Sequence, residues 1–237
     1  MTTPAPAAVE CVGVSKSFGP VQALKATDLT LATGTLTAVL GPSGCGKTTV
    51  LRAIAGFERV DAGTIRVSGQ AVAGPGLHLP PERRRVTIVP QEQAQFPHLT
   101  VAGNVGYGVR RGPERDKAVA AMLDLAGLAG LGDRMPHELS GGQQQRVAVA
   151  RALVSRPSVV FADEPTGNLD SKAGEEVLSL LRRAVDEFGQ TVVMVTHDPE
   201  AASYADRLVV LRDGRVVHDG AAGTPDQVIE LMKDVSG

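Results

Sequence analysis

A glycine-rich stretch followed by a lysine and a threonine has the clearest chemistry in the sequence. Residues 41–48 read Gly-Pro-Ser-Gly-Cys-Gly-Lys-Thr, which fits the pattern G-x-x-x-x-G-K-[ST] of a phosphate-binding loop. Glycines let the backbone wrap closely around a phosphate, and the backbone N–H groups then point inward. We expect the Lys47 ammonium to reach the β- and γ-phosphates and the Thr48 hydroxyl to be a Mg²⁺ ligand. The sequence therefore predicts a site for a nucleotide with magnesium.

The residues expected to contact the phosphates are the loop itself and the first turn after it. They are Gly41, Pro42, Ser43, Gly44, Cys45, Gly46, Lys47, Thr48 and Thr49. Cys45 has two interpretations, a redox-sensitive thiol or a small filler residue whose backbone contacts the phosphate. We favour the filler, because spacing alone gives no sign of a lowered thiol pKa.

Two adjacent carboxylates follow an apolar run at residues 159–162. Enzymes with a phosphate-binding loop place a Mg²⁺-associated Asp at the end of a buried strand, so Asp163 is expected to be that residue. Glu164 is the expected general base, which would orient and polarise an attacking water. His197 follows the apolar run 191–195 and is either a γ-phosphate contact or a solvated or helix-capping histidine. Spacing alone favours the second interpretation of His197.

Short apolar segments bounded by turn residues predict the strands that position these groups. Gly and Pro break up the stretch between residues 67 and 85. Helical periodicity occurs at 116–126, 143–154 and 172–187, and a further helix is expected to follow the phosphate loop to about residue 55. Alternating strands and helices favour a parallel sheet covered on both faces. Strands are expected at 9–14, 27–31, 36–40, 63–67, 85–89, 158–162, 191–195 and 208–211.

Composition excludes several classes of partner. The 237 residues carry a net charge of −2, contain 3% aromatic residues and have no Trp, which argues against a nucleic-acid surface. Two cysteines fit a reducing cytosol better than a disulfide framework. The start of the sequence does not resemble a signal peptide, and no apolar run approaches the ~20 residues of a membrane span. Arg83, Arg84 and Arg85 could suggest a contact with an anion or nucleic acid, but beside two prolines they are interpreted as a solvated turn.

Residues 139–146, Leu-Ser-Gly-Gly-Gln-Gln-Gln-Arg, give the chain a family resemblance. They resemble the signature motif of ATP-binding cassette (ABC) ATPases, and the resemblance extends from about residue 9 to 219. It implies that Phe18 stacks on adenine and that Gln91 is the Q-loop glutamine, which senses Mg²⁺ and the membrane partner. It also makes residues 167–170 the D-loop and His197 the switch histidine, which reverses the interpretation of His197 taken alone.

The resemblance further implies that ATP binds between two copies of the chain. Residues at the start of the signature helix offer its positive end and backbone donors to the phosphates of the partner's ATP. The residues implied to contact nucleotide in this way are Ser140, Gly141, Gly142, Gln143 and, from the D-loop, Asp170.

The fold that the resemblance implies is α/β, with a P-loop NTPase core of mostly parallel sheet, an N-terminal antiparallel β subdomain and a helical signature subdomain. We expect a disordered tail at residues 1–8 and a single domain at 9–237, with the helical subdomain inserted at about 92–155. The implied ligands are ATP and Mg²⁺. The implied partners are a membrane permease, a second copy of the chain and, for an importer, an extracytoplasmic solute-binding protein. Nucleic acid is not expected, and the implied location is the cytoplasmic face of the cell membrane.

Different segments resemble different subfamilies. Residues 80–85 and 96–105 resemble importers of ferric iron and polyamines, whereas 164–170 and 196–207 resemble lipoprotein-release and macrolide-export cassettes. We favour the importer, because 96–105 belongs to the segment 91–135 that is expected to meet the permease. The alternatives are the export type and a regulatory cassette of cell division. Chromosome-maintenance ATPases are disfavoured, since Gln91 and Ser140 are too close in sequence for a coiled coil between them. The 18 residues after Asp219 are too few for the C-terminal regulatory domain that many such importers carry.

Overall fold

The computed structural model describes residues 7–91 and 95–236. A mostly parallel sheet has the strand order β11-β10-β3-β9-β8-β7. Strands β10, β3, β9, β8 and β7 pair in parallel, and β11 pairs antiparallel with β10. The strands are β3 (Leu36–Leu40), β7 (Val86–Val89), β8 (Val159–Asp163), β9 (Val192–Val195), β10 (Arg207–Arg212) and β11 (Arg215–Ala221).

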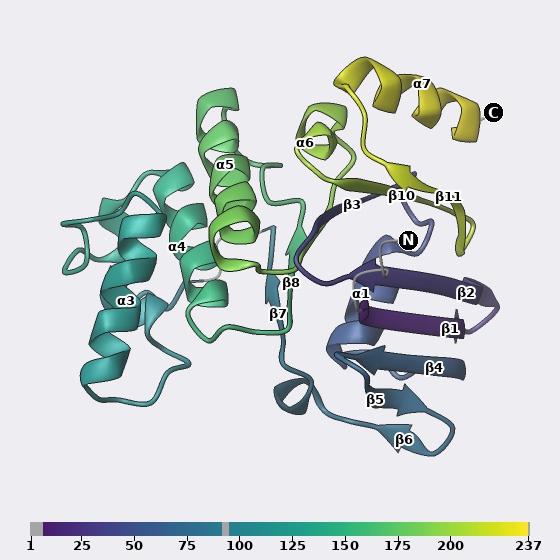
Figure 1. Ribbon diagram of the computed structural model, residues 1–237, viewed down its shortest axis with the longest axis horizontal. Helices are drawn as coiled ribbons and strands as arrows, with labels where there is room; N and C mark the ends of the chain where they lie inside the picture. Colours follow the sequence, from purple (N-terminus) through teal and green to yellow (C-terminus); the bar gives the residue numbers. More distant parts are fainter. Residues whose placement is uncertain (1–6, 92–94, 237) are drawn as a thin grey trace, which may run out of the picture.

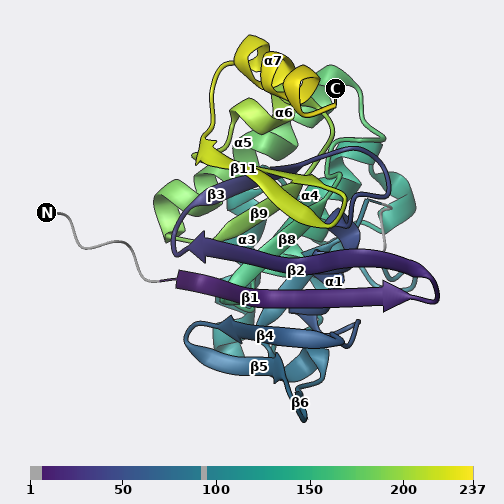
Figure 2. The same ribbon diagram turned by 90° about the vertical axis from the view of Figure 1, so that its right-hand side faces the viewer.

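A second sheet is antiparallel and has the order β2-β1-β4-β5-β6. Figure 2 shows these strands one beside the next in this order, from β2 to β6. The strands are β1 (Ala7–Phe18), β2 (Val21–Ala32), β4 (Ala62–Val67), β5 (Gln70–Gly74) and β6 (Leu77–His78).

The helices divide between the two sides of the parallel sheet. In Figure 1, α1 lies with the antiparallel sheet, whereas α3, α4 and α5 gather on the other side of the molecule. None of the helices among the described residues is both long enough and apolar enough to cross a membrane. The helices are α1 (Lys47–Ala55), α2 (Val101–Val105), α3 (Pro113–Leu125), α4 (Gly141–Leu153), α5 (Ser171–Phe188), α6 (Pro199–Ser203) and α7 (Pro225–Ser236), with short 3-10 turns at Pro81–Arg83 and Pro136–Glu138.

Alternate residues of each parallel strand enter two different hydrophobic clusters. In β8, Val159 and Phe161 pack with α1 and the antiparallel sheet, whereas Val160 and Ala162 pack with α4 and α5. Because successive strand side chains point to opposite faces, the sheet is buried on both sides. The prediction of a parallel α/β core, with an antiparallel β subdomain and a helical signature subdomain, is confirmed.

The structure adds elements that sequence patterning did not predict. Strands β5 and β6 lie in the stretch that Gly and Pro were expected to break up, and β11 and α7 follow the last expected strand. Strand β1 begins at Ala7, inside the stretch expected to be a tail, while residues 1–6 lie outside the described part. The strands β1 and β2 are also longer than expected, because their backbone pairing continues through polar residues.

The interpretation of the arginine run as a solvated turn is wrong for its central member. Arg83 and Arg85 are exposed, but Arg84 is only 2% exposed. Its guanidinium donates to the carbonyl oxygens of Leu79, Ala53 and Ile54 at 2.7–3.0 Å. A charged side chain can be buried when its donors are satisfied in this way, which a count of like charges in the sequence does not reveal.

We predict that Phe161→Ala destabilises the protein by about 3–5 kcal/mol, because it opens a cavity between β8 and α1. Phe161 is 1% exposed, whereas Phe57 is 55% exposed. Phe57→Ala is the matched control and should change the free energy of unfolding by less than about 0.5 kcal/mol. Urea unfolding of the three proteins measures the difference, and equal losses in the two variants would contradict this account of the core.

Candidate active site

The phosphate loop connects β3 to α1 and is squeezed between neighbouring backbone segments. Gly41 has a φ of +149°, and a Cβ there would lie 2.2 Å from the Leu211 carbonyl oxygen of β10. Gly46 has a φ of +106°, and a Cβ there would lie 2.6 Å from the Ala23 carbonyl oxygen of β2. Both positions therefore require glycine, for conformation and for space.

The Lys47 ammonium lies against the loop that precedes it. Its Nζ donates to the carbonyl oxygens of Gly41 (2.7 Å) and Pro42 (3.0 Å). Helix α1 has no side-chain cap and no acidic residue in its first turn, so the positive end of its dipole is not offset locally. Thr48 is exposed, and Cys45 is buried and 3.9 Å from the Lys47 Nζ. The loop and the start of α1 thus form a cationic, donor-rich end.

The two predicted carboxylates stand at the end of β8. Burial and the neighbouring Glu164 raise the pKa of the Asp163 carboxyl above its usual value, against a smaller opposite influence from Lys47. Glu164 has a φ of +48°, a left-handed conformation that costs a residue with a Cβ about 1–3 kcal/mol. Its backbone N–H donates to the Val195 carbonyl oxygen of β9 at 2.8 Å. The turn therefore holds Glu164 in a strained position next to β9.

His197 and Glu164 are brought into direct contact. The His197 Nδ1 lies 2.9 Å from Glu164 Oε1, within hydrogen-bond distance. The His197 side chain is 72% exposed and that of Glu164 is 18% exposed. Both residues follow the ends of parallel strands that pair with each other. The apolar runs predicted that each residue follows a strand, but neither the pairing of these strands nor the contact had a signal in the sequence.

Gln91 and the D-loop also meet at this edge. A Cβ at Gly167 would lie 3.1 Å from the Gln91 Nε2, so the glutamine side chain packs against the turn that follows Glu164. Asp170 caps α5 by accepting from the Ala173 N–H at 2.9 Å. The structure therefore places Gln91 beside the carboxylate turn and gives the Asp170 side chain a local capping partner.

The signature residues begin α4, on the other side of the parallel sheet from α1 (Figure 1). The Ser140 hydroxyl accepts from the Gln143 N–H, and the Gln143 side chain accepts from the Ser140 N–H. This reciprocal capping fixes the helix start. A Cβ at Gly142 would lie 2.7 Å from the Ala173 Cβ of α5, so the starts of α4 and α5 are in close contact.

Phe18 lies at the end of β1 with 46% of its surface exposed. The Lys16 Nζ is 5.0 Å from the centre of its ring. An exposed ring that already faces a cation offers a flat apolar surface suited to stacking a base.

The donors at this edge suit magnesium bound together with a nucleotide. No group of three or more His, Cys, Asp or Glu residues that could hold a metal occurs among the described residues. Mg²⁺ is usually held by one or two carboxylates together with substrate phosphates and waters. The repulsion between Asp163 and Glu164 would be relieved by a cation there. The predicted ligands Thr48, Asp163 and Gln91 would therefore need phosphate oxygens and waters to complete the coordination of the ion.

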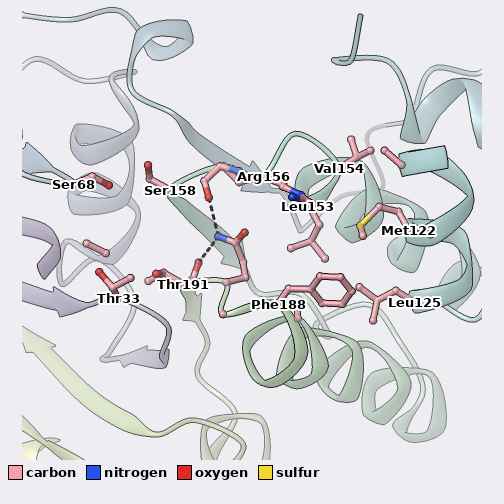
Figure 3. Close-up of a pocket in the computed structure, with 17 residues that line it drawn as sticks. Thr33, Ser68, Met122, Leu125, Leu153, Val154, Arg156, Ser158, Phe188 and Thr191 are labelled. Carbon is pink, nitrogen blue, oxygen red and sulfur yellow. Dashed lines mark hydrogen bonds between the residues drawn. The ribbon is translucent and has the colours of Figure 1, made fainter. Parts of the chain in front are cut away.

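A separate cavity of about 460 Å³ lies away from this edge. Figure 3 shows Leu153, Leu125 and Phe188 around it. The Gln190 side-chain amide donates to the carbonyl oxygens of Pro157 and Thr191. None of the residues predicted to contact nucleotide or metal lines it. Its apolar lining does not suit a triphosphate, so its size alone does not make it the active site.

Comparisons with known proteins agree on one family. The model described as "ABC transporter" matches residues 24–167. The chain is 47% identical over 217 residues to the Fe(3+) ions import ATP-binding protein FbpC of Pseudomonas fluorescens, covering 90% of this chain and 61% of that protein. It is 49% identical over 220 residues to the spermidine/putrescine import ATP-binding protein PotA of Frankia alni, covering 89% and 46%. The chain thus spans 46% to 61% of the length of these two relatives.

Solved structures give the same result. A dimeric ATP-binding cassette in a post-hydrolysis state, bound to ADP and Pi, is 34% identical, with a TM-score of 0.77 over 91% of this chain and 99% of that one. The protein cbiO1 from Clostridium perfringens, described as part of the ABC transporter complex cbiONQ, is 28% identical, with a TM-score of 0.83 over 95% and 91%.

We predict that Asp163→Asn raises the free energy of unfolding at pH 7. The Asp163 pKa is raised from 3.8 in the folded chain, so the folded state binds its proton more tightly than the unfolded state, and the ionised carboxylate destabilises the fold. The gain in the variant should be full at neutral pH and shrink as the pH falls towards 4. The exposed Asp133 provides the control Asp133→Asn, and urea unfolding at several pH values is the measurement. A loss of stability at pH 7 in Asp163→Asn would contradict the assignment.

Proposed function

Because the chain belongs to the ABC transporter family as an ATP-binding domain, we propose that it hydrolyses ATP to drive a separate membrane permease. One observation carries this proposal. Three adjacent parallel strands, β3, β9 and β8, end at the same edge in the phosphate loop, His197 and the Asp163–Glu164 pair. In open parallel sheets, ligands bind beyond the carboxyl ends of the strands.

The residues at this edge have separate roles in ATP binding and hydrolysis. Lys47 and the loop N–H groups bind the β- and γ-phosphates, and Phe18 stacks on the adenine. Bound Mg²⁺, held by Thr48, Asp163 and Gln91, would neutralise charge on the β- and γ-phosphate oxygens. Glu164 takes a proton from the attacking water as its oxygen bonds to the γ-phosphorus and the bond to ADP breaks.

Glu164 is suited to act as the base through its contact with His197. The 2.9 Å contact fixes the direction of the carboxylate. Because the contact uses only Nδ1, the other nitrogen of the exposed imidazole remains available to solvent or substrate. His197 is thereby proposed to contact the γ-phosphate while it orients Glu164.

A complete site is proposed to need two copies of the chain. The signature helix starts on the opposite side of the parallel sheet from α1 (Figure 1), so one copy does not supply both groups to one nucleotide. In the dimer, Ser140, Gly141 and Gly142 would present backbone donors and the positive end of α4 to the partner's ATP. The solved relative bound to ADP and Pi is dimeric, which supports this arrangement.

The permease is proposed to dock on the segment 91–135. There, Tyr107 is 61% exposed and its ring centre lies 4.2 Å from that of Phe96. The guanidinium carbon of Arg151 lies over the Phe96 ring, 5.6 Å from its centre. This supported aromatic pair resembles the anchors that dominate protein interfaces. The chain would then act at the cytoplasmic face of the membrane.

The transported solute is proposed to be ferric iron or a polyamine, taken up by an importer with a solute-binding protein outside the membrane. The names of the two relatives described above support this direction. The export-like segments 164–170 and 196–207 lie mainly around the catalytic edge, so the segment that meets the permease is the better guide to the partner.

We predict that Glu164→Gln lowers ATP turnover by at least about 100-fold, because it removes the base, while ATP affinity stays close to that of the wild type. The variant should accumulate as an ATP-bound dimer, measured by size-exclusion chromatography with ATP. Asp133→Asn, at an exposed position, is the control. Turnover near the wild-type rate in Glu164→Gln would remove Glu164 from the role of base.

We predict that importer-type membrane subunits stimulate ATP hydrolysis and that export-type or lipoprotein-release subunits do not. Tyr107→Ala should reduce the stimulation by about 10-fold, as for an interface anchor, and leave unstimulated hydrolysis unchanged. Phe188→Ala is the matched control, since Phe188 is 52% exposed but lies outside the segment 91–135. Stimulation only by an export-type subunit, in reconstituted vesicles, would overturn the importer assignment.

A further inference from the structure

Arg84 is a buried cation without a carboxylate partner among the described residues. It is 2% exposed and lies between two exposed arginines. Its donors go to three backbone carbonyl oxygens, and its Nη2 lies 3.2 Å from the His78 Nδ1. Burying a charged group is costly unless its hydrogen bonds are made. Burial lowers the Arg84 pKa, so a structural reason for keeping a cation here must offset that cost.

The partners of Arg84 come from two separate segments. Nη1 donates to Ala53 and Ile54, in the last turn of α1, whereas Nε donates to Leu79, just after β6. The last carbonyls of a helix have no partners within it and carry partial negative charge. The guanidinium therefore caps α1 with a charge of the right sign and ties its end to the segment 78–84.

The chain beyond α1 is shaped around this guanidinium. Gly56 caps α1 with a φ of +94°, and a Cβ there would lie 2.6 Å from the Arg84 Nε. The next residue, Arg85, accepts at its carbonyl from the Ser158 N–H, next to the start of β8. Arg84 is thus fixed from both sides, by α1 and by the beginning of the parallel strands.

The two segments that Arg84 joins lead to opposite parts of the active site. Helix α1 carries Lys47 at its first residue, and its nine residues form a rod of about 13 Å. Strand β7 begins at Val86, two residues after Arg84, and ends two residues before Gln91. A shift of α1 against β7 would therefore change the position of the phosphate loop relative to Gln91.

We propose that Arg84 is a positioning residue that locks the phosphate-loop helix to the strand carrying Gln91. Its guanidinium is engaged by backbone carbonyl oxygens and His78, so it is not among the residues proposed to bind nucleotide or metal. The lock makes the position of Lys47 depend on the strand that leads to the permease-facing segment. This inference rests on the proposed ATPase function, and its test is arranged so that the two fail separately.

The test compares Arg84→Met, which removes the cation but keeps an apolar stem, with Arg83→Met at the exposed neighbour. We expect Arg84→Met to raise the KM for MgATP by at least about 10-fold, with kcat per folded molecule changed by less than about 3-fold. Arg83→Met should match the wild type. A loss of folded protein would lower the apparent kcat but leave KM unchanged. A change in KM alone therefore distinguishes a positioning role of Arg84 from a role in stability.

If Arg84→Met folds poorly, a milder substitution and a double-mutant cycle test the same role of Arg84. Arg84→Lys retains the charge but not the planar fork, and should raise KM by about 3-fold or more. In a cycle with Gln91→Ala, the KM effects of Arg84→Lys should be non-additive by at least about 3-fold, as for coupled residues. Unchanged KM in both Arg84 variants, or additive effects in the cycle, would overturn the lock. If the wild type does not hydrolyse ATP even with a permease, the proposed function fails instead.

Discussion

The close approach of backbone to backbone at the phosphate loop is the constraint on which the rest of the structure depends. Gly41 and Gly46 leave no room for a Cβ, because carbonyl oxygens of Leu211 and Ala23 stand in that space. Those oxygens belong to β10 of the parallel sheet and β2 of the antiparallel sheet. The loop therefore keeps its shape only if both sheets pack around α1, which explains why an antiparallel layer accompanies a parallel core.

The same edge concentrates interactions that oppose folding. Two adjacent carboxylates, both partly buried, repel each other, and Glu164 adopts a left-handed backbone conformation. Each feature costs free energy that the surrounding strands must offset, and such costs are typical of catalytic sites. The neighbouring Val195 carbonyl and His197 side chain hold Glu164 in this conformation. The strain is thus a consequence of directing a carboxylate out of the sheet edge.

Sequence patterns predicted the elements whose burial is strongest. The four buried residues of β9 and the alternating faces of β8 give clear apolar runs, and the motifs placed the phosphate loop between a strand and a helix. Strands β5, β6 and β11 were not predicted from the sequence, because they are short or half exposed and their apolar signal is weak. The burial of Arg84 was not predicted, because two of the three carbonyl oxygens that bind it lie 31 and 30 residues away in sequence. The contact between Glu164 and His197 depends on strand order, which local pattern does not determine.

The division of the core into two clusters determines how a movement on one face of the parallel sheet can reach the other face. Helix α1 belongs to the cluster on one face of the parallel sheet, and α4 and α5 belong to the cluster on the other. A densely packed sheet separates them, and such interiors shift as units more readily than they deform. Contact between the faces must therefore pass around the sheet at its edge, where Gln91 meets Gly167, or through β7. Both routes include the strand that follows Arg84, so the segment between α1 and Gln91 is where a movement of the helical side can reach the nucleotide.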